Sequence, residues 1–261
     1  MAIAHVLKAV PPDGAAQLFL LFCDAGQRWQ DLMPLSDALG EAFASSAIVV
    51  LQGPHAVGDG SGWLTWPVTE DDLSPVVRPG VPMSGQSPDG AVLAAWDDAT
   101  LAAALTVALP GCLATIRNWQ AQMKVLPEAT ALIGLGEGAT VALAAAMSSM
   151  ADGHPVCGRI STVGGRFGPV PEVVSPALVF HLVHGKADAV VPFQHSVHMA
   201  RTLVQRDADV VADIVPHEGH EPSAELVRWL LDRLRSRVPR HLWQAAMRVQ
   251  GSTDPGGGCG G

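Results

Sequence analysis

Short apolar runs alternate with longer amphipathic segments along this chain. The runs at 17–23 (QLFLLFC) and 47–51 (AIVVL) are almost continuous in apolar residues, as is typical of strands buried on both faces of a sheet. Strands that alternate with helices predict an α/β fold of three layers, α/β/α, in which a mainly parallel, twisted sheet carries helices on both faces. Further strands are expected at 129–133, 176–183 and 208–215, and helices at 29–43, 101–123 (interrupted near Pro110-Gly111), 139–150, 197–204 and 224–235.

Length and local composition indicate how this fold is organised. The chain has 261 residues, which suits one α/β domain over residues 1–250. Residues 53–98 are rich in Gly, Pro, Ser and Asp and contain three tryptophans, so this irregular stretch is expected to form a lid or a pocket loop. The last residues, 251–261, are Gly-rich and are expected to be a flexible tail.

Charge and cysteine content exclude several classes of protein. The chain has 16 Lys and Arg residues against 25 Asp and Glu residues, a net charge of −9, whereas a nucleic-acid-binding surface needs a basic face. No apolar run is uninterrupted over about 18 residues, so no membrane span is expected. The four cysteines are scattered and form no CxxC pair. Neither a disulfide framework nor a zinc site is therefore expected, and the cytoplasm is the expected compartment.

Chemistry in a parallel α/β sheet gathers in loops at the carboxyl ends of the strands, and three such loops stand out. The first, 134–138 (GLGEG), lies between a predicted strand and a predicted helix. A strand, a tight turn and a helix with small residues at fixed positions form the geometry of a nucleophile elbow, G-x-S-x-G. The central residue here is Gly136, so no hydroxyl or thiol projects from the turn. A plain glycine-rich turn is the alternative interpretation.

The other two loops supply a carboxylate and an imidazole. Asp188 follows the strand predicted at 176–183, and it could orient a histidine or could cap the next helix. His220 follows the strand predicted at 208–215 and could act as a general base. The order of turn, Asp and His along the chain is the order of nucleophile, acid and base in α/β-hydrolases.

Several stretches resemble the phospholipase/carboxylesterase branch of the α/β-hydrolases, and in particular the bacterial YpfH-type esterases. The stretches are LFLLFCDAG, TIRNWQ, ALIGLGEGAT, HLVHGKADAVV, DIVPHEGHE and RVPRHLWQAAM. Together they cover roughly residues 15 to 248. The resemblance implies an α/β-hydrolase fold and a site for a small acyl or ester-type ligand, with no cofactor.

The resemblance also implies roles for single residues. Asp188 corresponds to the triad acid and His220 to the triad base. Glu137 would supply a backbone N–H to the oxyanion hole, and Trp63 would lie in the loop on the substrate side. The other residues expected at the oxyanion hole or pocket are Cys23, Asp24 and Ala25.

The chain departs from the family pattern within this site. Gly136 stands where the family has its serine nucleophile, and Glu137 replaces the usual Gln. Cys23-Asp24 stands where the family usually has His-Gly. Loss of the nucleophile costs a serine hydrolase on the order of 10⁶ in kcat. A carboxylate about 4 Å from a developing oxyanion opposes it by about 4 kcal/mol at an effective dielectric constant of about 20. The sequence therefore predicts little or no serine-dependent ester hydrolysis and favours a ligand-binding pseudoenzyme.

Two replacements for the serine stay open. Asp24 and His220 could activate a water molecule directly, without a covalent intermediate, in a hydrolase of small esters or thioesters. Cys23 could instead act as a thiol nucleophile, although a buried cysteine that only packs is the simpler interpretation. Metal binding is not expected, because only one of the histidine pairs spaced three apart, His195 and His198, is plausibly helical, and no cluster of Cys or carboxylate residues joins it.

Overall fold

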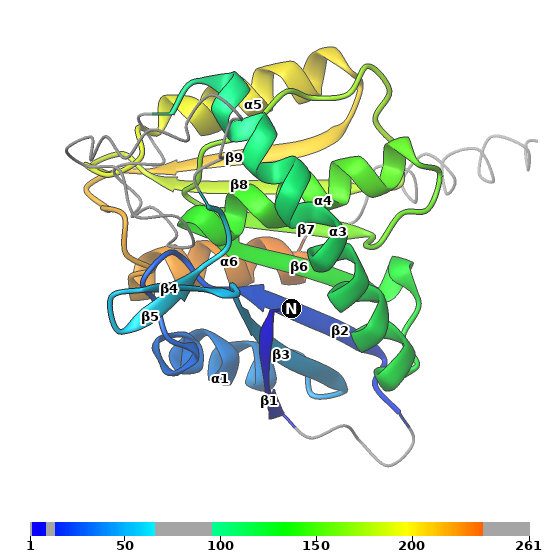
Figure 1. The fold of residues 1–261 in the computed structure, drawn as a ribbon. Helices are drawn as coiled ribbons and strands as arrows, with labels where there is room; N and C mark the ends of the chain where they lie inside the picture. Colours follow the sequence, from blue (N-terminus) through cyan, green and yellow to red (C-terminus); the bar gives the residue numbers. More distant parts are fainter. Residues whose placement is uncertain (1, 9–13, 66–95, 237–261) are drawn as a thin grey trace, which may run out of the picture.

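The structure is a computed structural model that describes residues 2–8, 14–65 and 96–236. Within this part of the chain, seven strands form one twisted sheet in the order β1-β3-β2-β6-β7-β8-β9, and β4 and β5 form a separate hairpin (Figure 1). Neighbouring strands of the large sheet run parallel, except that β1 is antiparallel to β3. The strands are β1 Ile3–Lys8, β2 Gln17–Phe22, β3 Ser46–Gln52, β4 His55–Val57, β5 Gly60–Gly62, β6 Thr130–Leu135, β7 Arg159–Val163, β8 Val179–Gly185 and β9 Asp209–Val215.

Helices cover both faces of the large sheet. Alternate residues of β2 point to opposite faces, so Leu20 packs into one core and Leu21 into the other. Residues of α3, α4 and α5 belong to the first core, and residues of α1 and α6 to the second (Figure 1). These helices are α1 Met33–Ala42, α3 Asp98–Met123, α4 Gly136–Ala151, α5 Gln194–Gln205 and α6 Ala224–Ser236, with short 3-10 helices at Trp29–Leu32 and Pro127–Ala129. The predicted three-layer α/β/α fold is confirmed.

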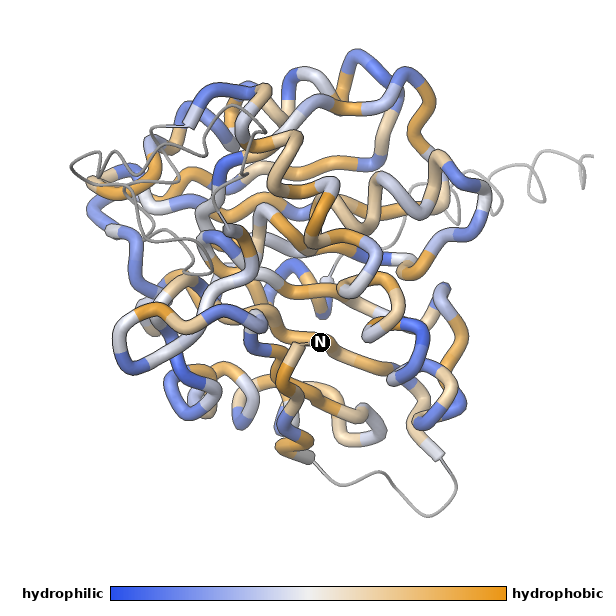
Figure 2. Tube along the Cα trace, viewed as in Figure 1, coloured by the Kyte–Doolittle hydropathy of each residue, from blue (hydrophilic) through white to orange (hydrophobic). Residues whose placement is uncertain are grey.

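The hydropathy of the chain follows these layers. Figure 2 shows hydrophobic residues along the strands of the large sheet and hydrophilic residues mainly in the turns that join the elements. All seven residues of β3 and all seven residues of β8 are buried. Strands buried on both faces in this way give the continuous apolar runs from which the sheet is predicted.

Helix α3 differs from the prediction, because it runs without interruption through Pro110-Gly111. Both residues are exposed, so water can bind the carbonyl group that the proline nitrogen leaves without a donor. The helix is also long and apolar enough to cross a membrane by length and composition, although the sequence predicted no span. It packs against α4 and β2, and Leu101 and Ile116 are fully buried. One face of the helix therefore lies in the first core, while apolar residues such as Val107 on its other face are exposed.

The prediction misses β1, β7 and the β4-β5 hairpin. β1 is an edge strand whose Ile3 is 54% exposed, so its residues do not form a buried run. In β7, buried Ser161 and Thr162 interrupt the apolar pattern. The hairpin lies at the start of the stretch that was expected to be an irregular lid. Most of that stretch, 66–95, and the expected tail, 251–261, lie outside the described residues.

Candidate active site

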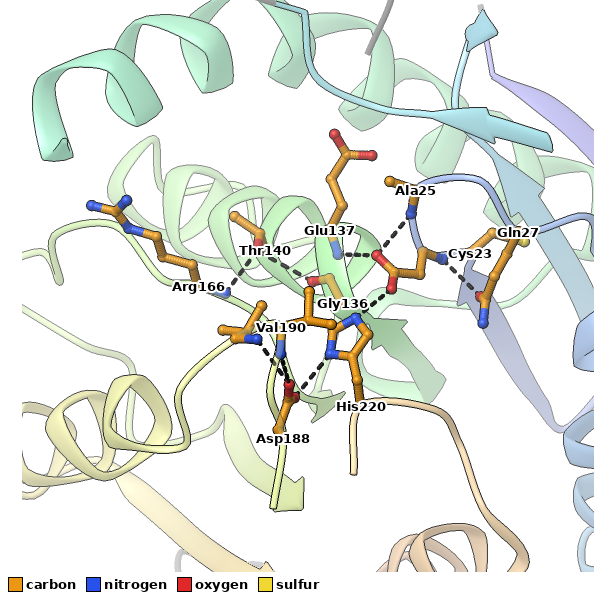
Figure 3. A network of polar contacts seen from close by, with 12 residues as sticks. Cys23, Ala25, Gln27, Gly136, Glu137, Thr140, Arg166, Asp188, Val190 and His220 are labelled. Atoms are coloured by element: carbon orange, nitrogen blue, oxygen red, sulfur yellow. Dashed lines mark hydrogen bonds and ion pairs between the residues drawn. The ribbon is translucent and has the colours of Figure 1, made fainter. Parts of the chain in front are cut away.

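The carboxyl ends of the parallel strands meet at one edge of the sheet, and four of them carry the candidate residues. Asp24 follows β2, and Gly136 follows β6. Asp188 follows β8, and His220 follows β9. The sheet therefore brings together residues that lie up to 196 positions apart in the sequence, and Figure 3 shows their network of polar contacts.

The turn between β6 and α4 has the predicted geometry of a sharp elbow. Gly136 has a φ of +48°, in the left-handed region that costs an L-residue about 1–2 kcal/mol. Gly134 and Gly138 allow close approach of the backbone. A Cβ on Gly134 would lie 2.4 Å from the Cα of Ala139, and a Cβ on Gly138 would lie 2.4 Å from the carbonyl oxygen of Cys23.

Asp188 and His220 are in direct contact, as the resemblance implies. The Nδ1–H of His220 donates to Oδ2 of Asp188 over 2.9 Å. Oδ1 of Asp188 accepts from the backbone N–H groups of Val190 and Val191, each at 2.8 Å. Asp188 therefore orients the imidazole of His220 and also holds the backbone of the loop after β8 at Val190 and Val191. The side chain of Asp188 is only 1% exposed, so these bonds fix its direction.

His184 is a further member of this group that the sequence analysis did not assign to it. Its Nε2–H donates to Oδ2 of Asp188 at 3.1 Å and to the carbonyl of Val191 at 2.9 Å, while its Nδ1 contacts the Ser196 hydroxyl at 2.7 Å. Burial raises the pKa of Asp188, but the hydrogen bonds from His184 and His220 outweigh it and hold that pKa well below its ordinary value. The sequence carried no clear signal of this contact, because His184 ends a strand and Asp188 lies in the loop after it.

The carboxylate of Asp24 is bonded to Ala25 and Glu137, two residues that the resemblance assigns to an oxyanion hole or pocket. Its Oδ1 accepts from the backbone N–H of Glu137 at 2.6 Å and from that of Ala25 at 2.7 Å. Its Oδ2 accepts from Nε2 of His220 at 2.8 Å. The dashed lines that end at Ala25, Glu137 and His220 in Figure 3 mark these bonds. The resemblance implies an oxyanion-hole role for the Glu137 N–H, and Ala25 is among the residues expected at the hole or pocket.

The same carboxylate also fills the space in front of the turn. A Cβ on Gly136 would lie 2.1 Å from both Cγ and Oδ1 of Asp24 and 2.2 Å from its Oδ2. Real Cβ atoms do not approach other atoms closer than about 3 Å. The sequence analysis expected no reactive group at this turn, whereas the structure places the carboxylate of Asp24 where a side chain at position 136 would begin. This carboxylate is itself bonded to the N–H groups of Ala25 and Glu137, rather than lying at a distance from them.

His220 lies between two carboxylates, and this sets its charge. Burial lowers the pKa of His220, but the hydrogen bonds and negative charges of Asp188 and Asp24 outweigh it and raise the pKa to about 10. Both ring nitrogens then donate, which is the hydrogen-bonding pattern of an imidazolium. At neutral pH the His220 ring is therefore a cation that lies between the carboxyl groups of Asp188 and Asp24.

The side chain of Glu137 joins the elbow to the segment after β5. Its carboxylate is buried and accepts from the backbone N–H groups of Trp63 at 2.7 Å and Leu64 at 3.0 Å. The indole N–H of Trp63 donates to the carbonyl of Cys23 at 2.9 Å. Trp63 is therefore buried beside the site, 3% exposed, and holds the end of β2. The prediction placed it in the substrate-side loop and missed this anchoring contact.

Two other expectations concern Cys23 and metal ions. Burial and the charges of Asp31 and Asp24 raise the pKa of Cys23 to about 12, so its thiol stays protonated at neutral pH. Both ring nitrogens of His220 are bonded to carboxylates, so neither is available to activate that thiol. Among residues 2–8, 14–65 and 96–236, no group of three or more His, Cys, Asp or Glu side chains could hold a metal ion.

Comparisons with known proteins show which proteins this chain is similar to. Esterase YpfH of Escherichia coli (strain K12) is 27% identical to this chain over 246 residues, which cover 93% of this chain and 92% of that protein. Esterase PE8 has a structure that matches with a TM-score of 0.69 at 21% identity and covers 91% of this chain and 99% of its own. A carboxylesterase from Mesorhizobium loti matches with a TM-score of 0.62 at 14% identity, covering 85% of this chain and 90% of its own.

These structural matches establish the α/β-hydrolase fold, and a sequence-family comparison establishes the family. The model of the family described as Phospholipase/Carboxylesterase matches residues 92–236, which is more than half of the 261 residues. The matched region contains the elbow, Asp188 and His220. The chain therefore belongs to the phospholipase/carboxylesterase family.

Proposed function

We propose that this chain is a carboxylesterase-family protein that does not hydrolyse esters through a seryl intermediate. Gly136 takes the place of the serine nucleophile, and the carboxylate of Asp24 takes the place of the substrate's oxyanion. The observation that carries the proposal is the pair of hydrogen bonds from Ala25 and Glu137 to Oδ1 of Asp24. Stabilisation of the oxyanion is the largest catalytic term in acyl transfer, and here its donors are already bonded to an anion.

The same contacts limit what can bind at this point. An ester or acyl ligand that places its carbonyl oxygen in the hole must displace the carboxylate of Asp24. Displacement breaks two charge-assisted hydrogen bonds, each worth about 1.5–3 kcal/mol. A small acyl ligand therefore binds weakly in this hole, unless Asp24 turns away or is neutralised.

Direct activation of water by His220 on an ester is the second candidate function, and the geometry favours it less. A general base needs a free nitrogen, whereas both ring nitrogens of His220 donate to carboxylates. Because the pKa of His220 is raised to about 10, the ring is protonated at neutral pH. His220 becomes a base only after Asp24 loses its negative charge.

The test is ester hydrolysis by four proteins: the native chain, Gly136→Ser, Asp24→Gly and the double variant. We expect hydrolysis of short-chain p-nitrophenyl esters at background rates by the native chain and by both single variants. Gly136→Ser places its Cβ against the carboxylate of Asp24, and Asp24→Gly leaves no nucleophile. The double variant has a hydroxyl and a vacant hole, so it should hydrolyse the esters and react with a fluorophosphonate probe.

Gly153→Ser is the matched control for backbone strain. Gly153 also has a positive φ, +75°, but a Cβ there would have no atom within 4 Å. We expect Gly136→Ser to lower the melting temperature more than Gly153→Ser does, and Asp24→Gly to reverse part of that loss. Rapid ester hydrolysis by the native chain together with probe labelling would contradict the proposal. High activity of Gly136→Ser alone would contradict it too.

We also propose that the chain acts in the cytoplasm as one domain over residues 1–250. Cys23, Cys112 and Cys157 are free buried thiols, which suits a reducing compartment. The match to Esterase YpfH over 92% of that protein supports a single unit of similar extent. Fractionation of the source cells tests the compartment, and limited proteolysis that releases a stable fragment within 1–250 would contradict the single domain.

A further inference from the structure

We propose that Asp24 is a carboxylate nucleophile that opens epoxides, which are strained cyclic ethers, by attack at a saturated carbon. The product is a 1,2-diol, formed through an alkyl ester of Asp24. This inference rests on the proposed function, because it uses the same occupation of the oxyanion hole by Asp24. It goes beyond that function by assigning a reaction and a class of substrate.

The two oxygens of Asp24 have different surroundings, and the difference suits a nucleophile. Oδ1 is held by two backbone N–H groups, those of Ala25 and Glu137. Oδ2 contacts His220, and the side chains of Asp24 and His220 are each 12% exposed. One oxygen is thus fixed by two backbone donors, while the other lies beside a proton donor and keeps a small exposure to solvent. Carboxylates are established nucleophiles in enzymes that form covalent ester intermediates.

The occupied hole also selects the kind of carbon that can react. Attack on an acyl carbon would create an oxyanion on the substrate, and the donors that would stabilise it are bonded to Oδ1 of Asp24. Attack on a saturated carbon creates no such oxyanion. It converts Asp24 into an ester whose own carbonyl oxygen, Oδ1, already lies in the hole. The site is therefore arranged to stabilise negative charge on Asp24 and not on a substrate carbonyl.

In the first step, Asp24 opens the epoxide ring and His220 supplies the proton that the ring oxygen needs. A bond forms between Oδ2 and the epoxide carbon, and the carbon–oxygen bond of the ring breaks. The electron pair of that bond goes to the ring oxygen, which takes the proton from Nε2 of His220 and becomes a hydroxyl. Asp24 loses its negative charge as His220 loses its positive charge. The need for a proton at the leaving oxygen favours an epoxide over an alkyl halide.

The second step uses water and restores the resting state. Alkylation removes one of the two anions that hold the proton on His220, so the neutral imidazole can act as a base. Water gives a proton to Nε2, its oxygen bonds to Cγ of Asp24, and Oδ1 carries the negative charge within the hole. The bond between Cγ and Oδ2 then breaks, and the alkoxide takes the proton from Nε2. The new carboxyl group finally transfers its proton to His220, so the sum is epoxide plus water giving diol.

Oxygen-18 labelling of the native chain tests this route directly. The probe is styrene oxide, reacted in H₂¹⁸O with the protein in excess so that each site turns over once. The oxygen delivered to the first diol comes from Oδ2, while the oxygen of water enters the carboxylate. We expect the peptide that contains Asp24 to gain 2 Da, which is one ¹⁸O atom, and the diol to contain no ¹⁸O.

Two variants and one internal control test the roles of these residues. His220→Gln removes the proton donor of the first step, so we expect neither the diol nor the alkyl ester of Asp24 above background. Asp24→Asn should lower diol formation at least about 100-fold. Asp213 is the internal control, since it also contacts a histidine (His181, 2.9 Å) but its other oxygen is held by Arg233 instead of backbone N–H groups. No label is expected on Asp213.

The outcomes separate this inference from the proposed function. Absence of diol, or diol that contains ¹⁸O beside an unlabelled Asp24, overturns the carboxylate nucleophile. If the native chain is still inactive toward p-nitrophenyl esters in that case, the proposed function stands alone. Native ester hydrolysis with fluorophosphonate labelling would instead overturn the proposed function, and the inference with it.

Discussion

Asp24 and Gly136 form one structural unit, although they lie 112 positions apart in the chain. The carboxylate needs the space that a side chain at 136 would take, and the sharp turn tolerates glycine without strain. Asp24 lies just after β2, and its carboxylate fills the space in front of the turn at Gly136. Under the proposed function, this carboxylate takes the place of the group that a nucleophile elbow would present.

Glu137 gives a prediction at the scale of the residue. Its buried carboxylate accepts from the N–H groups of Trp63 and Leu64, so Glu137→Gln turns an amide NH₂ group toward a backbone donor. A buried polar group left without its partner costs about 1–3 kcal/mol. We expect this loss in the free energy of unfolding, measured by urea denaturation. Glu128→Gln, at an exposed position, should change it by less than about 0.5 kcal/mol, and equal effects of the two variants would refute the anchoring role.

At the scale of the element, the sequence predicts strands and helices correctly where the pattern of apolar residues is continuous or regular. The buried strands β3 and β8 contain long apolar runs, and the predicted and observed positions overlap. The signal fails where a half-exposed edge strand such as β1 or buried hydroxyl groups as in β7 break the pattern. It also fails at Pro110, because local propensity cannot show that the carbonyl without a donor faces water.

Helix α5 allows a matched test of burial. Leu203 is fully buried in the first core, and the next residue, Val204, is 65% exposed. Leu203→Ala removes buried methyl groups and leaves a cavity, which costs about 2–5 kcal/mol. Val204→Ala should change stability by about 0.5 kcal/mol or less. Thermal and urea unfolding of both variants provide the check, and a Leu203→Ala variant as stable as the native chain would refute the assignment of this face to the core.

At the scale of the whole molecule, the sheet determines which side chains meet. The sequence and the resemblance identify Asp188 and His220 as partners, because motif and chain order carry that information. They also identify Asp24 as a departure. They do not place its carboxylate in the oxyanion hole, since that contact spans 196 residues to His220 and depends on the direction of one side chain. The positions of the strands bring Asp24 and His220 near each other. Hydrogen bonds from Ala25, Glu137 and His220 then fix the conformation of the Asp24 side chain.

The network of Asp24, His220 and Asp188 links the loops after β2, β8 and β9, so it should make global stability depend on pH. His220 has a pKa raised to about 10 in the folded chain, against 6.5 when unfolded. Its contribution is therefore complete below pH 6.5 and is lost as the pH rises toward 10. From pH 7 to 8, below the ordinary cysteine pKa of about 8.5, we expect the free energy of unfolding to fall by about 1 kcal/mol after allowance for partial solvent exposure. Asp24→Asn removes one of the two anions, so its decrease over the same range should be smaller, and an NMR titration should find a lower pKa for the His220 ring. Parallel stability curves for the native chain and Asp24→Asn would show that the carboxylate of Asp24 does not hold the proton on His220.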